Sequence, residues 1–113
     1  MNVFDKIYSS AKPFLDMTGY TFKTTFWGDF GIAETIGGQK GVQETFDRAF
    51  EEWKSNVEYI TELVLVLNWK SWQYAETNED LARLYNSLWE KADGWCMDNL
   101  KDDDLKYFLR TTD

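Results

Sequence analysis

Large apolar and aromatic residues recur at helical spacing over about half of this chain, from Thr45 to Leu100. Residues at positions i, i+3, i+4 and i+7 share one face of an α-helix, and such a face must be buried against another element. The pattern predicts an all-α fold, a compact bundle of five to six helices, and it favours no particular chemistry. The residues of this stripe are Phe46, Phe50, Trp53, Ile60, Leu63, Val64, Leu67, Leu81, Leu84, Tyr85, Leu88, Trp89, Ala92, Trp95 and Cys96.

A chain of 113 residues suits a single helical domain over residues 1–113. Six Trp, six Tyr and eight Phe can fill its core, because each aromatic side chain buries about 150–250 Å². The run Leu63–Leu67 is apolar on all sides, so we expect its helix to lie at the centre with residues 81–96 packed against it. The helices predicted from periodicity and breakers cover residues 2–16, 29–36, 40–54, 56–75 and 77–99, with a short final helix from residue 102.

Several residues mark where these helices begin. Ser55 and Glu58 match the S-x-x-E capping box, which predicts a helix start here. The alternative is one continuous helix through Ser55. Thr77 is the expected N-cap of the following helix. Gly94 lies inside that helix at a cost of roughly 1 kcal/mol relative to Ala, which suggests that another element approaches closely there.

Residues 20–27 alternate aromatic and polar side chains, a pattern typical of an extended backbone. No second strand is evident, so we expect an extended segment that lies on the helices. The alternative is a small two-stranded element formed with residues 110–113.

The net charge of −8 opposes direct binding to nucleic acid or to an anionic membrane, because phosphate contacts need clustered Lys and Arg. Two interpretations remain open. The charge can serve solubility, or it can form an acidic face for a protein partner with a basic surface.

Targeting signals are not evident. Residues 1–15 carry charges inside their apolar pattern, and Leu63–Leu67 is far shorter than the roughly 20 residues that span a bilayer. We expect a soluble, cytoplasmic protein. The single cysteine, Cys96, lies on the apolar face of a predicted helix and should be a small buried hydrophobic residue.

Histidine is absent, which removes the most frequent general base and metal ligand. We therefore expect no catalytic residues, no metal and no cofactor. The alternative is a carboxylate-metal (Mg) nucleotide hydrolase, since some carboxylate pairs are loosely similar to the acidic motifs of all-α pyrophosphatases. Those carboxylates are Glu76 with Glu79, Glu90 with Asp93, and the i,i+4 pair Glu58 and Glu62.

Two surfaces are candidates for partner binding. The first is aromatic: Tyr20, Phe22, Phe26 and Trp27 hold more aromatic area than a loop needs, and they either cap the helical core or form a binding patch. The second is acidic and comprises Asp98, Asp102, Asp103 and Asp104. Helix capping accounts for part of this second cluster. A structural subunit that forms a homodimer through exposed aromatic residues is a further alternative.

Four segments together resemble a family of small uncharacterised proteins encoded on mobile elements (conjugative elements and phages) of gut Firmicutes. The segments are T-F-K-T-T-F-W at 21–27, T-F-D-R-A-F-E-E-W at 45–53, Y-I-T-E-L-V-L-V-L-N-W-K at 59–70 and Y-F-L-R-T-T-D at 107–113. The resemblance spans most of the chain, and its motifs describe packing more than chemistry. Small acidic proteins of such elements are often inhibitors of host defence, including anti-CRISPR and anti-restriction proteins.

The net charge of −8, the absence of histidine and this resemblance together predict a non-enzymatic, acidic protein-binding module. The expected partner is a nucleic-acid-handling protein of host defence, which the module would inhibit.

Overall fold

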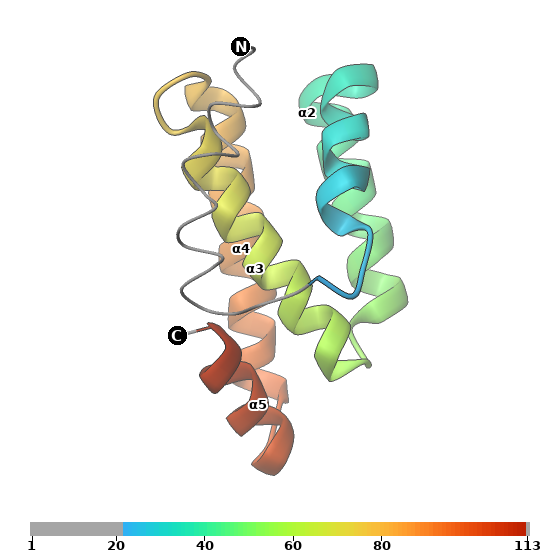
Figure 1. Cartoon of the computed structure of the whole chain (residues 1–113), viewed down its shortest axis with the longest axis vertical. Coiled ribbons are helices and arrows are strands. Elements are labelled where there is room, and N and C mark those ends of the chain that lie inside the picture. Colours follow the sequence, from blue (N-terminus) through green and yellow to red (C-terminus); the bar gives the residue numbers. More distant parts are fainter. Residues whose placement is uncertain (1–21, 113) are drawn as a thin grey trace.

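The computed structural model describes residues 22–112, and no strand occurs within this range. Four helices make up the described chain: α2 (Phe26–Trp53), α3 (Val57–Tyr74), α4 (Glu79–Asn99) and α5 (Asp102–Thr112) (Figure 1). The all-α prediction is confirmed. Residues 110–112 are helical, so they do not form the two-stranded alternative. The helix predicted over residues 2–16 lies outside the described residues.

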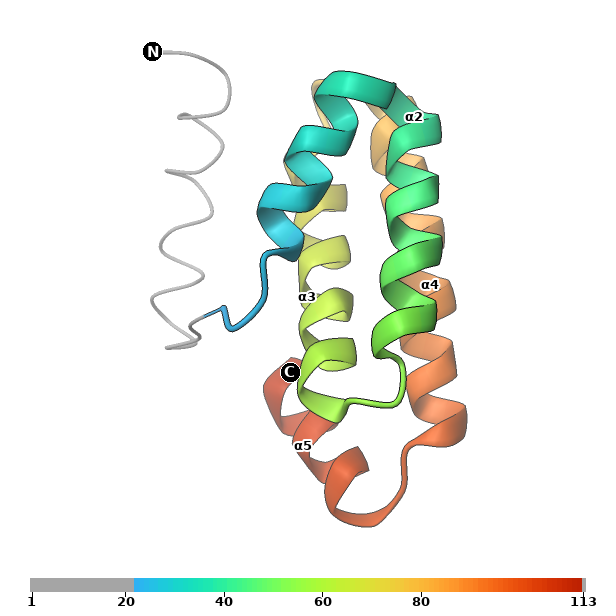
Figure 2. The ribbon, with the colours of Figure 1, turned by 90° about the vertical axis from the view of Figure 1, so that its right-hand side faces the viewer.

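Two helices that were predicted as separate, over residues 29–36 and 40–54, form one kinked helix, α2. The kink is at Gly38, whose φ of 57° and ψ of −141° are readily adopted only by a residue without a Cβ. Residues 26–37 and residues 39–53 are thus two arms that fold back on each other (Figure 2). The described chain therefore has four helices rather than the five predicted for it.

A glycine next to the kink lets the two arms approach. A Cβ on Gly41 would lie 2.6 Å from the carbonyl oxygen of Ala33, closer than real Cβ atoms come to an oxygen. The predicted close approach at Gly94 is wrong, because a Cβ added there would meet nothing within 4 Å.

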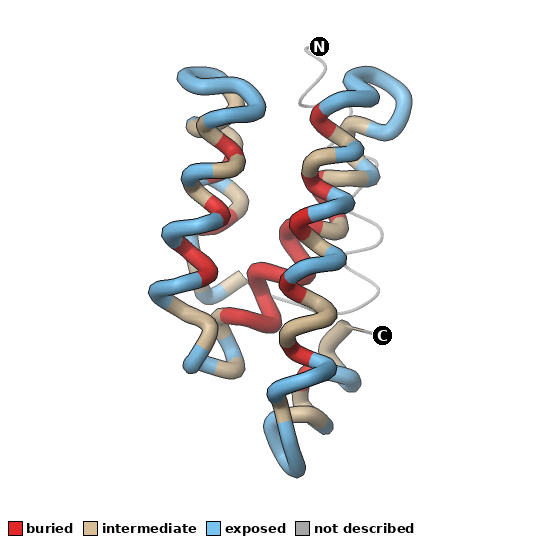
Figure 3. Tube along the Cα trace, turned by 180° about the vertical axis from the view of Figure 1, so that it is seen from behind, coloured by how far each residue is buried: buried red, intermediate tan, exposed pale blue. Residues whose placement is uncertain are grey.

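Helix α3 is central, as predicted. Every residue from Ile60 to Leu67 is buried, and α3 packs against α4, α5 and α2 (Figure 3). Cys96 of α4 is fully buried in the same core. None of the helices within residues 22–112 combines the length and apolar character that crossing a membrane requires.

Asparagine side chains cap α3 and α4. The Oδ1 atom of Asn56 accepts a hydrogen bond from the Tyr59 amide at 3.1 Å, and that of Asn78 accepts one from the Leu81 amide at 3.1 Å. The predicted caps at Ser55 and Thr77 are therefore wrong by one residue each. The continuous-helix alternative is also wrong, because α2 ends at Trp53 and Asn56 has an extended backbone.

Candidate partner-binding site

The segment ahead of α2 is held by a buried carboxylate on α3. Glu62 is fully buried and accepts hydrogen bonds from the backbone amides of Lys23 (3.1 and 3.0 Å) and Thr24 (2.8 Å). The Thr24 hydroxyl donates to the same carboxylate at 2.5 Å. Residues 22–25 are not helical and lie on α3, as expected. However, Thr24 and Thr25 form a bend, with Thr25 at φ −97° and ψ 10°, and residues from Phe26 onward are helical. The extended backbone predicted for residues 20–27 is therefore wrong from Thr24 onward.

Two of the carboxylates named for a metal site, Glu58 and Glu62, bind the segment ahead of α2. Glu62 binds the 22–25 segment, and Glu58 accepts a hydrogen bond from the Lys23 ammonium at 2.8 Å. Within residues 22–112 no group of three or more acidic or cysteine side chains is arranged to hold a metal ion.

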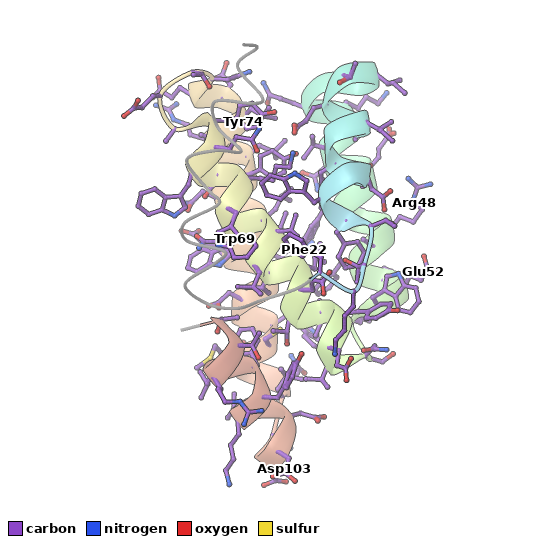
Figure 4. The ribbon with its side chains drawn as sticks, viewed as in Figure 1. Phe22, Arg48, Glu52, Trp69, Tyr74 and Asp103 are labelled. Atoms are coloured by element: carbon purple, nitrogen blue, oxygen red, sulfur yellow. The ribbon has the colours of Figure 1, made fainter. Side chains whose placement is uncertain are left out.

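The predicted aromatic surface begins with two rings that pack on the bundle. Phe22 meets Trp69 of α3 edge-on, with ring centroids 5.3 Å apart, and stacks on Trp27 at 6.2 Å (Figure 4). The half-buried Trp27 ring also faces the Lys70 ammonium, which lies 4.4 Å from the ring centroid. Both rings therefore have partners within the fold.

Of the two remaining aromatic candidates, Phe26 lies in the core and Tyr20 is outside the described residues. Phe26 is only 5% exposed and packs edge-on against Tyr59, with centroids 6.5 Å apart. Tyr20 lies outside the described residues. The described part of this segment thus packs as a cap on the helical core, and Phe26 cannot reach a partner in this conformation.

A buried polar cluster joins the first arm of α2 to α3. The Lys70 ammonium lies 3.0 Å from a carboxylate oxygen of Glu34, and the Tyr74 hydroxyl donates to the same carboxylate at 2.6 Å. Burial lowers the pKa of Lys70, although Glu34 opposes this, and burial raises the pKa of Tyr74. Because the ion-paired side chains are only 1% and 9% exposed, we interpret the cluster as a structural contact.

The acidic candidates lie together at the junction of α4 and α5. Asp98 belongs to α4, and Asp102, Asp103 and Asp104 form the first turn of α5; all four are exposed. Figure 4 shows Asp103 at the lower end of the molecule. Within the described chain none of them forms an ion pair, not even with the neighbouring Lys101 or Lys106. We call these four residues the acidic end.

A pocket of about 230 Å³ lies between α3, α4 and the C-terminal half of α5, and its residue Met97 directly precedes Asp98 of the acidic end. Its polar side chains are Asn68, Asp93 and Thr112, one from each helix. Asp93 is half-buried, and no donor among the described residues makes a hydrogen bond or ion pair with its carboxylate. Burial raises the pKa of Asp93. The apolar side chains of the pocket are Val64, Leu65, Trp89, Met97, Phe108 and Leu109.

A second, more open groove of about 390 Å³ lies between the two arms of α2. Its charged side chains are Asp29, Arg48 and Glu52, and Figure 4 shows Arg48 and Glu52 on the outer side of α2. Arg48 and Glu52 both belong to the second arm of α2, whereas Asp29 belongs to the first.

Comparison of this chain with protein-family models, with curated proteins and with solved structures finds no match.

Only some of these site residues could be identified from the sequence pattern. The sequence spacing pairs Asp93 with Glu90 as a candidate metal ligand, whereas the structure places Asp93 in a pocket that Glu90 does not line. Glu62, Val66 and Lys70 recur every fourth residue of α3, and this spacing indicates one helix face with a charge at each end. That face binds the 22–25 segment and Glu34.

Proposed function

We propose that this chain is a non-enzymatic protein-binding module that captures a partner with a basic surface through its acidic end. The observation that carries this proposal is the set of exposed, unpaired carboxylates of Asp98, Asp102, Asp103 and Asp104 at one end of the described chain. Exposed charges of one sign speed encounter with an oppositely charged partner and fix its orientation.

Helix capping alone does not require so many acids. Carboxylates stabilise a helix N-terminus by roughly 0.3–1 kcal/mol each, and α4 begins with two of them, Glu79 and Asp80. Helix α5 begins with three, and Asp98 adds a fourth across the junction. The additional charge is available to a partner.

The partner class that we propose is a nucleic-acid-handling protein, which the module inhibits by covering its basic surface. Support comes from the net charge of −8 and from the resemblance to proteins of mobile elements. Carboxylates on a rigid helix end can occupy positions that such a protein keeps for phosphates.

A charge-neutralising variant tests the proposal. Replacing Asp102, Asp103 and Asp104 by Asn should weaken capture of proteins from a host lysate by about tenfold, since each exposed ion pair contributes about 0.2–1 kcal/mol. Excess duplex DNA should release the captured partner. Capture that survives both treatments would refute the proposal.

The matched control removes the same charge at the opposite end of α4. Glu76, Glu79 and Asp80 are exposed, and they belong to the turn between α3 and α4 and to the first turn of α4. The start of α4 lies at the end of the bundle away from α5 (Figure 1). Changing these three to their amides should leave capture unchanged. An equal loss in both variants would mean that only net charge matters.

A further inference from the structure

The pocket between α3, α4 and α5 contains a carboxylate without a partner. Asp93 is half-buried, and none of the ion pairs within residues 22–112 includes its carboxylate. Removing a carboxylate from water without a compensating cation or donor is unfavourable. Such a group favours a bound cation.

The other polar atoms of the pocket suit an ammonium group. Asn68 offers a carboxamide oxygen, and the Thr112 hydroxyl donates to the Phe108 carbonyl at 2.7 Å, which leaves the hydroxyl oxygen free to accept. Together with Asp93, three acceptors line one pocket. A lysine ammonium has three donors, whereas the planar guanidinium of arginine has five.

The size and rim of the pocket suit one long side chain. A volume of about 230 Å³ is below the ~300–1,000 Å³ of ordinary small-molecule sites. The rim residues Met97 and Leu109 are 50% and 38% exposed. Apolar rim atoms can cover the four-carbon stem of a lysine while its charged end reaches the carboxylate.

We propose that this pocket binds a lysine side chain of the basic partner, with Asp93 as the counter-ion and Asn68 and Thr112 as further acceptors. The inference rests on the proposed function, because the partner that brings the lysine is the one drawn to the acidic end. Met97, on the pocket rim, directly precedes Asp98 of the acidic end. One basic segment can therefore contact both.

The test uses the full chain and two defined peptides, measured by calorimetry at 0.15 M salt. One is a ten-residue peptide that alternates lysine and alanine, and the other has arginine in place of each lysine. The unmodified chain should bind the lysine peptide more tightly than the arginine peptide. Asp93→Asn should weaken lysine-peptide binding about tenfold or more, because it removes a charged hydrogen-bond partner.

Glu90→Gln is the matched control, since it removes one charge from an exposed position one turn before Asp93. It should leave binding within about twofold of the unmodified chain. Thermal unfolding of each variant confirms that the fold is intact.

The Asp93→Asn variant and the triple Asp102, Asp103 and Asp104 variant together distinguish failure of the pocket inference from failure of the proposed function. If Asp93→Asn binds as the unmodified chain does while the triple Asp102, Asp103 and Asp104 variant binds more weakly, the pocket inference is overturned and the proposed function stands. If neither variant changes binding, both are overturned. Equal affinity for the two peptides would overturn the assignment to lysine.

Discussion

The Lys70 ammonium lies 3.0 Å from the Glu34 carboxylate in the interior of the fold, although the two residues are 36 positions apart in the sequence. The pair joins the first arm of α2 to the central helix α3. Tyr74 donates to the same carboxylate, and the Trp27 ring faces the ammonium. The position of that arm depends on this contact as well as on apolar packing.

Breaking this pair should destabilise the fold strongly. Lys70→Met keeps an apolar stem but leaves the Glu34 carboxylate buried without its cation, which typically costs about 3–5 kcal/mol. The measurement is the free energy of unfolding from urea denaturation. For comparison, Arg83→Ala breaks the exposed i,i+4 pair with Glu79 and should cost about 0.3–0.5 kcal/mol. Similar losses in the two variants would contradict a buried pair.

Two glycines should respond to alanine in opposite directions. Gly41→Ala places a Cβ against the Ala33 carbonyl oxygen and must push the arms of α2 apart, at a cost of about 1–3 kcal/mol. Gly94→Ala meets no neighbour and should stabilise α4 by about 0.5–1 kcal/mol. Urea unfolding of both variants checks the signs, and a stabilising Gly41→Ala would refute the contact between the arms.

The N-cap of α3 can be verified by a pair of adjacent substitutions. Asn56→Ala removes the acceptor for the Tyr59 amide and should cost about 1 kcal/mol. Ser55→Ala should have little effect, because Ser55 is exposed and does not cap the helix. Unfolding midpoints in urea measure both. A larger loss at Ser55 would restore the capping-box prediction.

Asp93 should lower the stability of the free protein near neutral pH. Burial raises the pKa of Asp93 above its ordinary value of 3.8, so the folded chain binds this proton more tightly than the unfolded chain does. Stability is therefore lost as the pH rises from 3.8 through the raised pKa, and the loss persists at pH 7. Asp93→Asn should raise the thermal midpoint at pH 7 but not at pH 3. A lower midpoint at pH 7 would indicate that Asp93 has a stabilising partner.

A destabilising carboxylate is easier to explain if it serves binding, since functional sites often reduce stability. The pH measurement thus bears on the pocket without any partner. The matched control is Glu90→Gln, which changes an exposed carboxylate one turn before Asp93.

The apolar periodicity of the sequence was sufficient to predict α3, α4 and the buried run Leu63–Leu67. These features depend on local spacing, because one helix face must be buried whatever its neighbours are. The glycine pair at 37 and 38 predicted a break, but not that the two arms fold back on each other. That arrangement depends on the contact between Gly41 and Ala33.

The partners of the buried charged residues could not be predicted from sequence periodicity. Glu62 pairs with Thr24 and Lys70 pairs with Glu34, and these partners lie 38 and 36 residues away. The sequence likewise could not show that Asp93 lacks an ion-pair partner, because this depends on how the neighbouring helices pack around the pocket. The exposure of Asp98, Asp102, Asp103 and Asp104 follows from the local sequence, since neighbouring acids at a helix start remain exposed.

The most direct measurement of the central claim is amide NMR of the isotope-labelled chain during titration with the lysine–alanine peptide. We predict that the largest shifts occur at residues 98–104 and around Asp93, and that residues 76–80 remain unchanged. Shifts centred on residues 76–80, shifts spread evenly over all exposed acids, or no shifts at all would contradict a binding site at the acidic end.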